Sequence, residues 1–552
     1  MPYLHHFLLP ARTWQLLFFC LLAGYCLYYA PFGINETDGG FLTGLAWQVL
    51  SGKMLYQEVI YVRPPLPVWL RVMEIKYLPE TWAILGERWI FYGKIACYSW
   101  LGASVLTKGG SRWQLASLGF VVSAHCYPPM AWHTVDGILF AVFAAWLLVK
   151  DRPIATFISG ITLAGSLLCK QSFYPLLPVF ILFAAIKPAK GMQNAGVLMS
   201  GTLLTLGVFG WYLALDHRLD AFWQMTGGAS SARQALEHGI LDYFRITPEL
   251  ALPGLALLIP AFYGYYKQKN TRYPCYFWII WLLALPLSFI AVTLWRQEHT
   301  VPFAASRAMF LIAVGYLCSN VWRSEFVRKG AFSPRILSAL QNRRSEWLLL
   351  LVSWSAAVSW GYNLPILFAT PWVWAGMKIT EKMTSGVFRP GWHHALSLGY
   401  LLLLLGTFRV GYSFIYRDGK RIDMHQPMGE IFTALQSVYS DDQTAEMYQE
   451  LKLLASKYQV FAVMPAFPQA HFLTKSKPPL PLDWVVNRET NGHNELVERK
   501  MREKQPILFI QKSFWPKIQT DPELSLTREW VNSSVLLEET IHFKVLSVYG
   551  ER

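Results

Sequence analysis

Three charged residues stand at the edges of apolar segments, where they could act on a bound molecule. Asp38 follows the first apolar segment in "INETDGGFLTGLAW", Arg63 precedes a run of prolines in "YVRPPLPVWL", and Asp136 begins a later segment in "AWHTVDGILF". A carboxylate can orient a hydroxyl group and accept its proton, and a guanidinium offers a fork of donors suited to phosphate oxygens. Because ionisable groups near membrane depth are costly, these residues predict a shared cavity with an acidic and a basic side.

Each of the three residues also has a simpler interpretation, which the sequence leaves open. The stretch N-E-T-D-G-G has good turn chemistry, so Asp38 could be an ordinary turn residue. Asp136 could cap the helix that it begins. Arg63 could bind lipid headgroups, and we expect the prolines that follow it to hold the backbone extended and aim its side chain.

The composition indicates a membrane protein with a soluble tail. Of the 552 residues, 53% are hydrophobic and 15% are charged, whereas about 25% are charged in an average soluble protein. Residues 1–416 contain 32 Lys and Arg and 17 Asp and Glu, but residues 417–552 contain 17 and 18. We therefore predict a multispan α-helical membrane domain over 1–416 and a small water-soluble domain over 417–552. The positive excess is scattered among apolar segments, which fits the positive-inside rule and argues against a nucleic-acid partner.

Apolar segments separated by charged loops predict about thirteen membrane-spanning helices. If the N-terminus is cytoplasmic, the short loops rich in Lys and Arg fall inside, and the tail falls outside, in the periplasm of a bacterium. Two outer segments, 32–88 and 216–248, are long, and each contains a helical pattern that we expect to lie along the membrane interface. The predicted spans are 14–31, 89–107, 113–130, 136–150, 154–169, 173–187, 195–215, 249–266, 274–295, 302–321, 346–361, 364–379 and 394–414.

The pattern of the tail predicts a small α/β domain. Three stretches are strand-like and two are helix-like. No nucleophile elbow, phosphate loop or metal-ligand cluster occurs in the tail sequence, so it could recognise an acceptor, cap the membrane domain or serve as structural support. The strand-like stretches are 459–465, 506–511 and 540–549, and the helix-like stretches are 444–458 and 494–504.

The first outer segment resembles a known superfamily of membrane enzymes. The stretch "ETDGGFLTGLAWQVLSGKMLYQEVIYVRPPLPVWL" is similar to the first outer loop of the GT-C superfamily glycosyltransferases that use polyprenyl-phosphate sugars, in the family-39-like group of protein O-mannosyltransferases and the lipid A aminoarabinose transferase. The start of a later span, "DGILFAVFAAWLL", also resembles that group. The resemblance covers residues 14–415 and is strongest in 34–150. Thirteen spans with an outer tail fit the architecture of the aminoarabinose transferase.

The resemblance implies roles for four residues. Asp38 matches the acidic residue that activates the acceptor, and Asp136 matches a second acidic residue of the catalytic site. Arg63 matches the basic residue that contacts the lipid phosphate. Lys170, in "LLCKQSFYPLLP", matches a lysine that would contact the same donor phosphate.

Three further polar residues are expected in the same cavity. Many relatives have an adjacent Asp-Glu pair after the first span, whereas here a glycine follows the aspartate and Glu36 lies two residues before it. Arg296 and His299 lie in a short outer loop between two predicted spans. The resemblance implies no cofactor. The sequence shows no metal-ligand spacing, although some GT-C enzymes use a metal ion.

The resemblance implies that a sugar moves with inversion from a polyprenyl-phosphate donor to an acceptor hydroxyl on the periplasmic face of the inner membrane. The acceptor would be a lipid, a glycan or a protein. A polysaccharide polymerase or ligase, a transporter of lipid-linked substrates and a non-catalytic scaffold are alternatives. A transporter is expected to carry charges deep within its spans and often has repeated halves, and neither feature is visible in this sequence.

Overall fold

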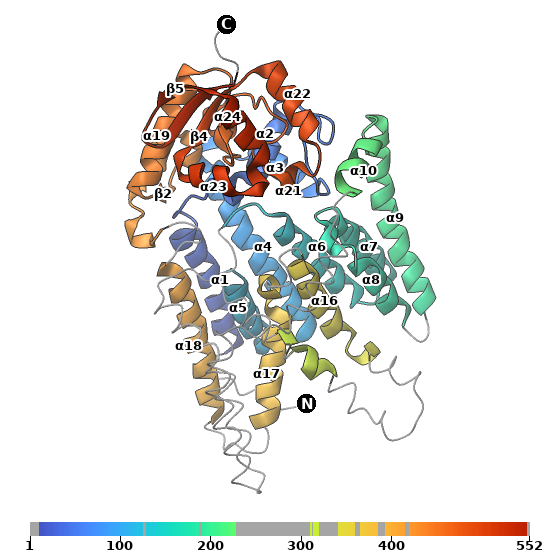
Figure 1. Ribbon diagram of the computed structural model, residues 1–552. Coiled ribbons are helices and arrows are strands. Elements are labelled where there is room, and N and C mark those ends of the chain that lie inside the picture. Colours follow the sequence, from blue (N-terminus) through green and yellow to red (C-terminus); the bar gives the residue numbers. More distant parts are fainter. Residues whose placement is uncertain are drawn as a thin grey trace, which may run out of the picture.

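A helical bundle carries an α/β region at one end of the molecule (Figure 1). The structure is a computed structural model. It describes residues 10–124, 129–186, 190–227, 310–311, 313–318, 340–358, 365–384, 392–413 and 419–548. We call the described residues up to 413 the helical region and residues 419–548 the C-terminal region.

The helical region contains long helices that run roughly along the bundle and shorter ones near the C-terminal region (Figure 1). The first helix continues into a π-helical turn, Tyr25–Tyr29. The helices are α1 (Ala11–Gly24), α2 (Phe41–Leu50), α3 (Leu66–Tyr77), α4 (Ala83–Leu106), α5 (Gly110–Ala124), α6 (His133–Leu148), α7 (Pro153–Leu167), α8 (Leu176–Ala185), α9 (Gly191–Leu215), α10 (Leu219–Gly227), α16 (Arg344–Val358), α17 (Thr370–Thr384) and α18 (Trp392–Ser413).

The predicted spans that lie within the described residues overlap with helices, although the span predicted over 364–379 is divided between a 3-10 helix, Pro365–Phe368, and α17. The predicted spans 249–266 and 274–295, and most of 302–321, lie outside the described residues. Within the described part, α9 is the one helix that is both long and apolar enough to cross a membrane. Shorter apolar helices occur at His133–Leu148, Pro153–Leu167, Gln171–Ala185 and Leu398–Arg409. The structure therefore supports a largely helical first part, while the number of spans stays a prediction.

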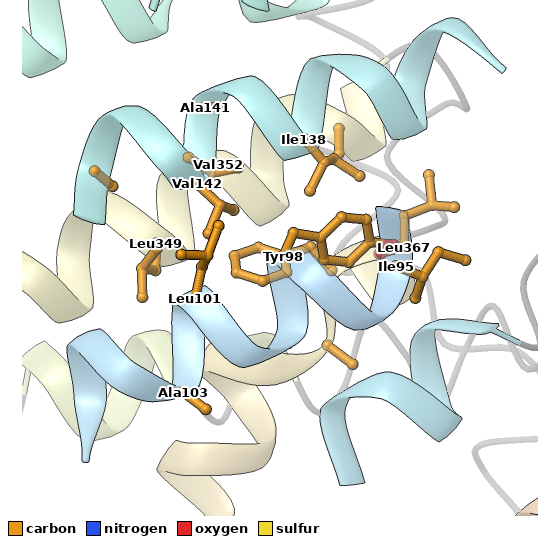
Figure 2. Packing of buried hydrophobic residues seen from close by; sticks show 14 of the residues in the cluster. Ile95, Tyr98, Leu101, Ala103, Ile138, Ala141, Val142, Leu349, Val352 and Leu367 are labelled. Atoms are coloured by element: carbon orange, nitrogen blue, oxygen red, sulfur yellow. Dashed lines mark hydrogen bonds between the residues drawn. The ribbon is translucent and has the colours of Figure 1, made fainter. Parts of the chain in front are cut away.

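Aliphatic and aromatic side chains from α4, α6 and α16 fill the centre of the helical region. Figure 2 shows Tyr98 of α4 among Ile138 of α6, Val352 of α16 and Leu367. The Tyr98 hydroxyl donates to the carbonyl of Leu367 at 2.7 Å, so the buried phenol is satisfied in an apolar setting. This packing holds α4 and α6, the helices that carry several of the buried charges described below.

Two glycines let α7 and α9 approach closely. A Cβ on Gly160 would lie 2.1 Å from the carbonyl oxygen of Leu198, and one on Gly201 would lie 2.2 Å from that of Phe157. Such backbone contact through small residues is typical of helix pairs in membranes. These contacts fix the position of α7, whose C-terminal end leads to Lys170.

The C-terminal region contains a four-stranded sheet in the order β3-β4-β6-β5. Strand β3 (Phe461–Met464) pairs in parallel with β4 (Ile507–Gln511), and β6 (Phe543–Ser547) pairs antiparallel with both β4 and β5 (Val535–Glu539). Three of these strands and the helices α19 (Asp442–Lys457) and α22 (Asn494–Lys504) lie where the sequence predicted them. The smaller elements are β1 (Gln426–Pro427), β2 (Tyr439–Ser440), α20 (Ala470–Thr474), α21 (Asn487–Thr490), α23 (Trp515–Thr520) and α24 (Ser525–Ser533).

Helix α2 joins the two regions. The predicted helix is present, but its buried side packs on protein, because a Cβ on Gly44 would lie 2.3 Å from the carbonyl oxygen of Pro468. The Trp47 indole donates to the carbonyl of Ser476 at 2.9 Å. Helix α2 is therefore covered by the C-terminal region rather than lying with that side on a lipid interface. In the second long outer segment, 216–248, the structure describes residues 216–227, which include α10, and residues 228–248 lie outside the described residues.

Candidate active site

Asp38 lies on a loop that is held from two sides. It begins a one-turn 3-10 helix, Asp38–Gly40, directly before α2, and it is buried. The Asn35 side chain closes the turn by accepting from the backbone and hydroxyl of Thr37 at 3.1 and 2.8 Å. Arg88 of α4 donates to two carbonyl groups of the preceding loop at 2.6 and 2.7 Å. Since Asn35 closes the turn, turn formation alone does not explain the buried carboxylate.

Arg63 forms a two-pronged ion pair with the C-terminal region. Its Nη1 and Nη2 atoms donate to the two carboxylate oxygens of Glu489 at 2.7 and 2.8 Å, and the guanidinium lies 5.3 Å from the centre of the Phe41 ring. Burial favours a lower pKa for Arg63, but the charge and hydrogen bonds of Glu489 outweigh burial, so the pKa is raised. The charge of Asp38 acts in the same direction, which places its carboxylate within electrostatic reach of Arg63.

Lys170 lies on the same side of the site. It follows α7, it is buried, and its Nζ atom donates to the hydroxyl of Thr134 at 3.0 Å. Its charge interacts unfavourably with that of Arg63 and favourably with that of Glu489. His133, also buried, is within reach of both cations, and its Nδ1 atom has no hydrogen-bond partner among the described residues. The two predicted phosphate contacts are thus neighbours. We call Asp38, Arg63, Lys170 and Glu489 the boundary cluster.

Asp136 pairs with a residue that the sequence analysis did not select. It lies in the first turn of α6, where Trp132 is the N-cap residue, so the capping interpretation of Asp136 is wrong. Its Oδ1 atom lies 2.6 Å from Nζ of Lys94 on α4, and Lys94 also lies 3.5 Å from Glu74 of α3. The second predicted carboxylate is therefore balanced by a lysine from the neighbouring helix.

The pair formed by Lys94 and Glu74 continues into a second group of buried charges. Arg71 of α3 contacts Glu74 at 3.0 Å and forms a close ion pair with Glu87 of α4. Side chains of Arg71 and Glu87 are 0% and 3% exposed. We call Arg71, Glu74, Glu87, Lys94 and Asp136 the internal network.

A hollow adjoins the loop of Asp38. It is small, with a volume of about 30 Å³, and its lining residues come from both the helical and the C-terminal region. Its polar lining includes Asn35, Glu87 and Gln469, and Gly39, the residue after Asp38, also lines it. The loop that carries the predicted base therefore borders a small polar hollow at the boundary of the two regions.

The remaining predicted residues have mixed outcomes. Glu36 is half-buried on the Asp38 loop, whereas Arg296 and His299 lie outside the described residues. The sequence analysis missed Lys94, although a lysine inside the apolar stretch "WIFYGKIACYSW" is a signal of its own. It also missed Glu489, for which the tail sequence offers no signal. Over the described ranges, no three His, Cys, Asp or Glu side chains gather as metal ligands would.

Solved membrane-enzyme structures resemble this chain, whereas no family model and no curated protein matches it. The oligosaccharyltransferase of Archaeoglobus fulgidus is 10% identical over 98% of this chain and 74% of its own, with a TM-score of 0.46. The same archaeal enzyme, AglB, in complex with an inhibitory peptide and a dolichol-phosphate is 11% identical over 97% and 74%, with a TM-score of 0.47. ArnT from Cupriavidus metallidurans, bound to undecaprenyl phosphate, is 12% identical over 98% and 99%, with a TM-score of 0.42.

These neighbours are an oligosaccharyltransferase and ArnT, each about 10–12% identical to this chain. TM-scores below 0.5 at such low identity reflect a similar course of the chain rather than matching sites, and the function is therefore argued from the residues of this chain. Along nearly its whole length, the chain is similar to solved structures of the oligosaccharyltransferase of Archaeoglobus fulgidus and of ArnT from Cupriavidus metallidurans.

Proposed function

We propose that this protein is an inverting glycosyltransferase that moves a sugar from a polyprenyl-phosphate donor to an acceptor hydroxyl. The observation that carries the proposal is the boundary cluster, in which the buried carboxylate of Asp38 lies within electrostatic reach of Arg63. Arg63 in turn is a neighbour of Lys170. A base and a pair of cations in one buried site are what this reaction needs.

The reaction follows from these charges. Asp38 accepts the proton of the acceptor hydroxyl, and the oxygen forms a new bond to the anomeric carbon of the sugar. The bond from that carbon to the phosphate oxygen breaks, and the lipid phosphate leaves with the electron pair. Arg63 and Lys170 hold the negative charge of the leaving phosphate. Attack from the face opposite the phosphate inverts the anomeric configuration.

Asp136 is assigned a positioning role in this proposal. Its carboxylate is balanced by Lys94 at 2.6 Å, so it orients the α4 and α6 side of the site instead of accepting the proton.

We further propose the arrangement expected from the sequence: residues 1–416 lie in a bacterial inner membrane, and residues 417–552 lie in the periplasm. The transferred sugar is a hexosyl or a pentosyl group. Testing which donors and which acceptors support turnover identifies the sugar and the acceptor. Release of a polyprenyl pyrophosphate instead of the monophosphate would point to a polymerase or ligase, and movement of the intact donor across the membrane would point to a transporter.

The test is transfer by the full chain, reconstituted in lipid, from labelled polyprenyl-phosphate sugars, with release of free polyprenyl phosphate as the readout. Asp38→Asn should lower the rate by about 100-fold or more, because the base is lost, while the melting temperature stays close to that of the wild type. Asp423→Asn is the matched control, since Asp423 is exposed in the C-terminal region and its variant should turn over normally. Wild-type turnover by Asp38→Asn would remove Asp38 from this role.

A further inference from the structure

The C-terminal region reaches into the site through Glu489. This residue lies on α21, a single helical turn on the side of the C-terminal region that faces the bundle (Figure 1). The turn is tied down by Asn487, whose side chain donates to the carbonyl of Pro522 at 2.9 Å, and by the Arg488 backbone, which donates to Glu523 at 3.0 Å. Glu489 therefore approaches Arg63 from a well-supported position.

The carboxylate of Glu489 occupies the fork of Arg63 in the way that a phosphate would. Both guanidinium nitrogens donate, one to each carboxylate oxygen. Carboxylate and phosphate bind this fork with the same two-pronged geometry. A donor phosphate that binds Arg63 in this manner must therefore take the place of Glu489.

The charges in the boundary cluster support exchange over simultaneous binding. The charge of Arg63 is already matched by the carboxylate of Glu489, and the charge of Asp38 acts on Arg63 as well, whereas burial lowers the pKa of Lys170. A lipid phosphate adds at least one further negative charge, and like charges in a buried site repel strongly because the surroundings screen them weakly. The balance is restored when Glu489 leaves the fork.

The side chain of Arg63 is also less enclosed than that of the arginine in the internal network. The Arg63 side chain keeps 20% of its surface exposed, whereas the Arg71 side chain in the internal network keeps none. The Arg63–Glu489 pair is therefore less enclosed than the Arg71–Glu87 pair.

We propose that Glu489 holds the donor-phosphate site closed in the absence of donor, and that the lipid phosphate displaces it and releases α21 from Arg63. The proposal rests on the proposed function, because it takes Arg63 as the phosphate contact. The C-terminal region then competes with the donor phosphate for Arg63. Donor binding is thereby coupled to the loss of a contact between the two regions.

Binding of undecaprenyl phosphate to the full chain in lipid nanodiscs tests this inference. Glu489→Gln should bind undecaprenyl phosphate about fivefold to tenfold more tightly than the wild type, because a closed state no longer competes. Glu495→Gln is the matched control, since Glu495 is exposed six positions further on, and it should bind as the wild type does. Equal or weaker binding by Glu489→Gln would overturn the proposal.

Hydrogen exchange on the wild-type protein gives a second measurement that does not depend on a variant folding. Adding undecaprenyl phosphate should speed exchange in residues 486–492, because the contact with Arg63 is lost. Unchanged or slower exchange there would also contradict the displacement. Arg63→Gln separates a failure of the proposed donor site from a failure of the displacement. If this variant binds undecaprenyl phosphate normally, the proposed donor site itself is wrong. If Arg63→Gln loses binding but Glu489→Gln gains none, only the displacement by phosphate is wrong.

Discussion

The internal network and the boundary cluster contain the same kinds of side chain, but the partners that neutralise their charges come from different parts of the chain. In the internal network, Arg71 donates to the Thr43 hydroxyl, to Glu74 and to a backbone carbonyl, each at 3.0 Å, and it also pairs with Glu87. Glu87 in turn accepts from the backbone of Ala131 at 2.6 Å. These partners come from helices and loops that are neighbours in the bundle.

In the boundary cluster, Arg63 is paired with Glu489, a residue from the C-terminal region. Arg63 and Glu489 are 426 positions apart, and their side chains are 20% and 8% exposed. The enclosed Arg71–Glu87 pair holds helices together, whereas a pair with one partner from another region of the chain can present its charge to a ligand when that partner leaves. Burial of charge is therefore a poor guide to function by itself, and the origin and exposure of the partner are better guides.

Removing Arg71 tests whether the internal network stabilises the fold, and it should have the largest effect on stability. Arg71→Met keeps the apolar stem but leaves Glu87 buried without its main partner, which should cost about 3–5 kcal/mol of stability. The measurement is thermal unfolding of the full chain in detergent. Arg63→Met should lower the melting temperature by much less, because the Glu489 carboxylate left behind is 8% exposed and can gain water. A melting temperature of Arg71→Met equal to that of Arg63→Met would mean that the two groups do not differ in this way.

This contrast also explains what the sequence could and could not predict about the site. Asp38 and Arg63 lie within one outer segment, so their placement in one site followed from local patterns and from the resemblance. The partner Glu489 could not be predicted, because pairing over 426 positions depends on how the C-terminal region docks. Lys94 was predictable in principle, since a lysine in an apolar stretch needs a partner.

The fold shows the same division between local and distant information. The long apolar segments predicted helices well, because length and hydropathy are local properties. For α2 the periodic pattern predicted an apolar face but not its partner, and that partner is Pro468 of the C-terminal region rather than lipid. Strand β5 was missed, because Val535–Glu539 is largely exposed and lacks an alternating pattern. The prolines after Arg63 lead into α3, with Pro67 in its first turn, instead of an extended segment.

A second contact between the two regions can be tested by measuring how stability depends on pH. Gln48 of α2 donates to Asp483 at 2.8 Å, and His471 lies 3.7 Å from the same carboxylate. Burial raises the pKa of Asp483 from 3.8 to about 7 and lowers the pKa of His471 from 6.5 to about 3. Between about pH 4 and pH 6.5, the folded pair and the unfolded pair therefore each hold one proton, so this contact should leave stability independent of pH.

Asp483→Asn should remove that balance. The folded variant would then hold no proton at this contact, while the unfolded His471 would still bind one below its pKa of 6.5. Stability should rise with pH up to about 6.5, and the variant should be less stable at about pH 5 than at about pH 7.5 by roughly 2 kcal/mol. Melting temperatures across this range, with Asp423→Asn as control, check the prediction. A profile for Asp483→Asn as flat as that of the wild type would contradict it.

Changing Asp136 tests whether this residue belongs to the internal network or to the catalytic site. The expected effect on the transfer rate is the smallest of those proposed. Because Lys94 balances this carboxylate at 2.6 Å, Asp136→Asn should lower sugar transfer by about tenfold, or about 1.4 kcal/mol, well short of the loss in Asp38→Asn. The loss should arise from the charge left on Lys94, so adding Lys94→Met to Asp136→Asn should restore part of the rate, and the two changes should not be additive. Transfer rates of the two single variants and the double variant form the cycle. If Asp136→Asn is as inactive as Asp38→Asn and Lys94→Met gives no rescue, Asp136 belongs with the boundary cluster as a second catalytic carboxylate, as the sequence resemblance first implied.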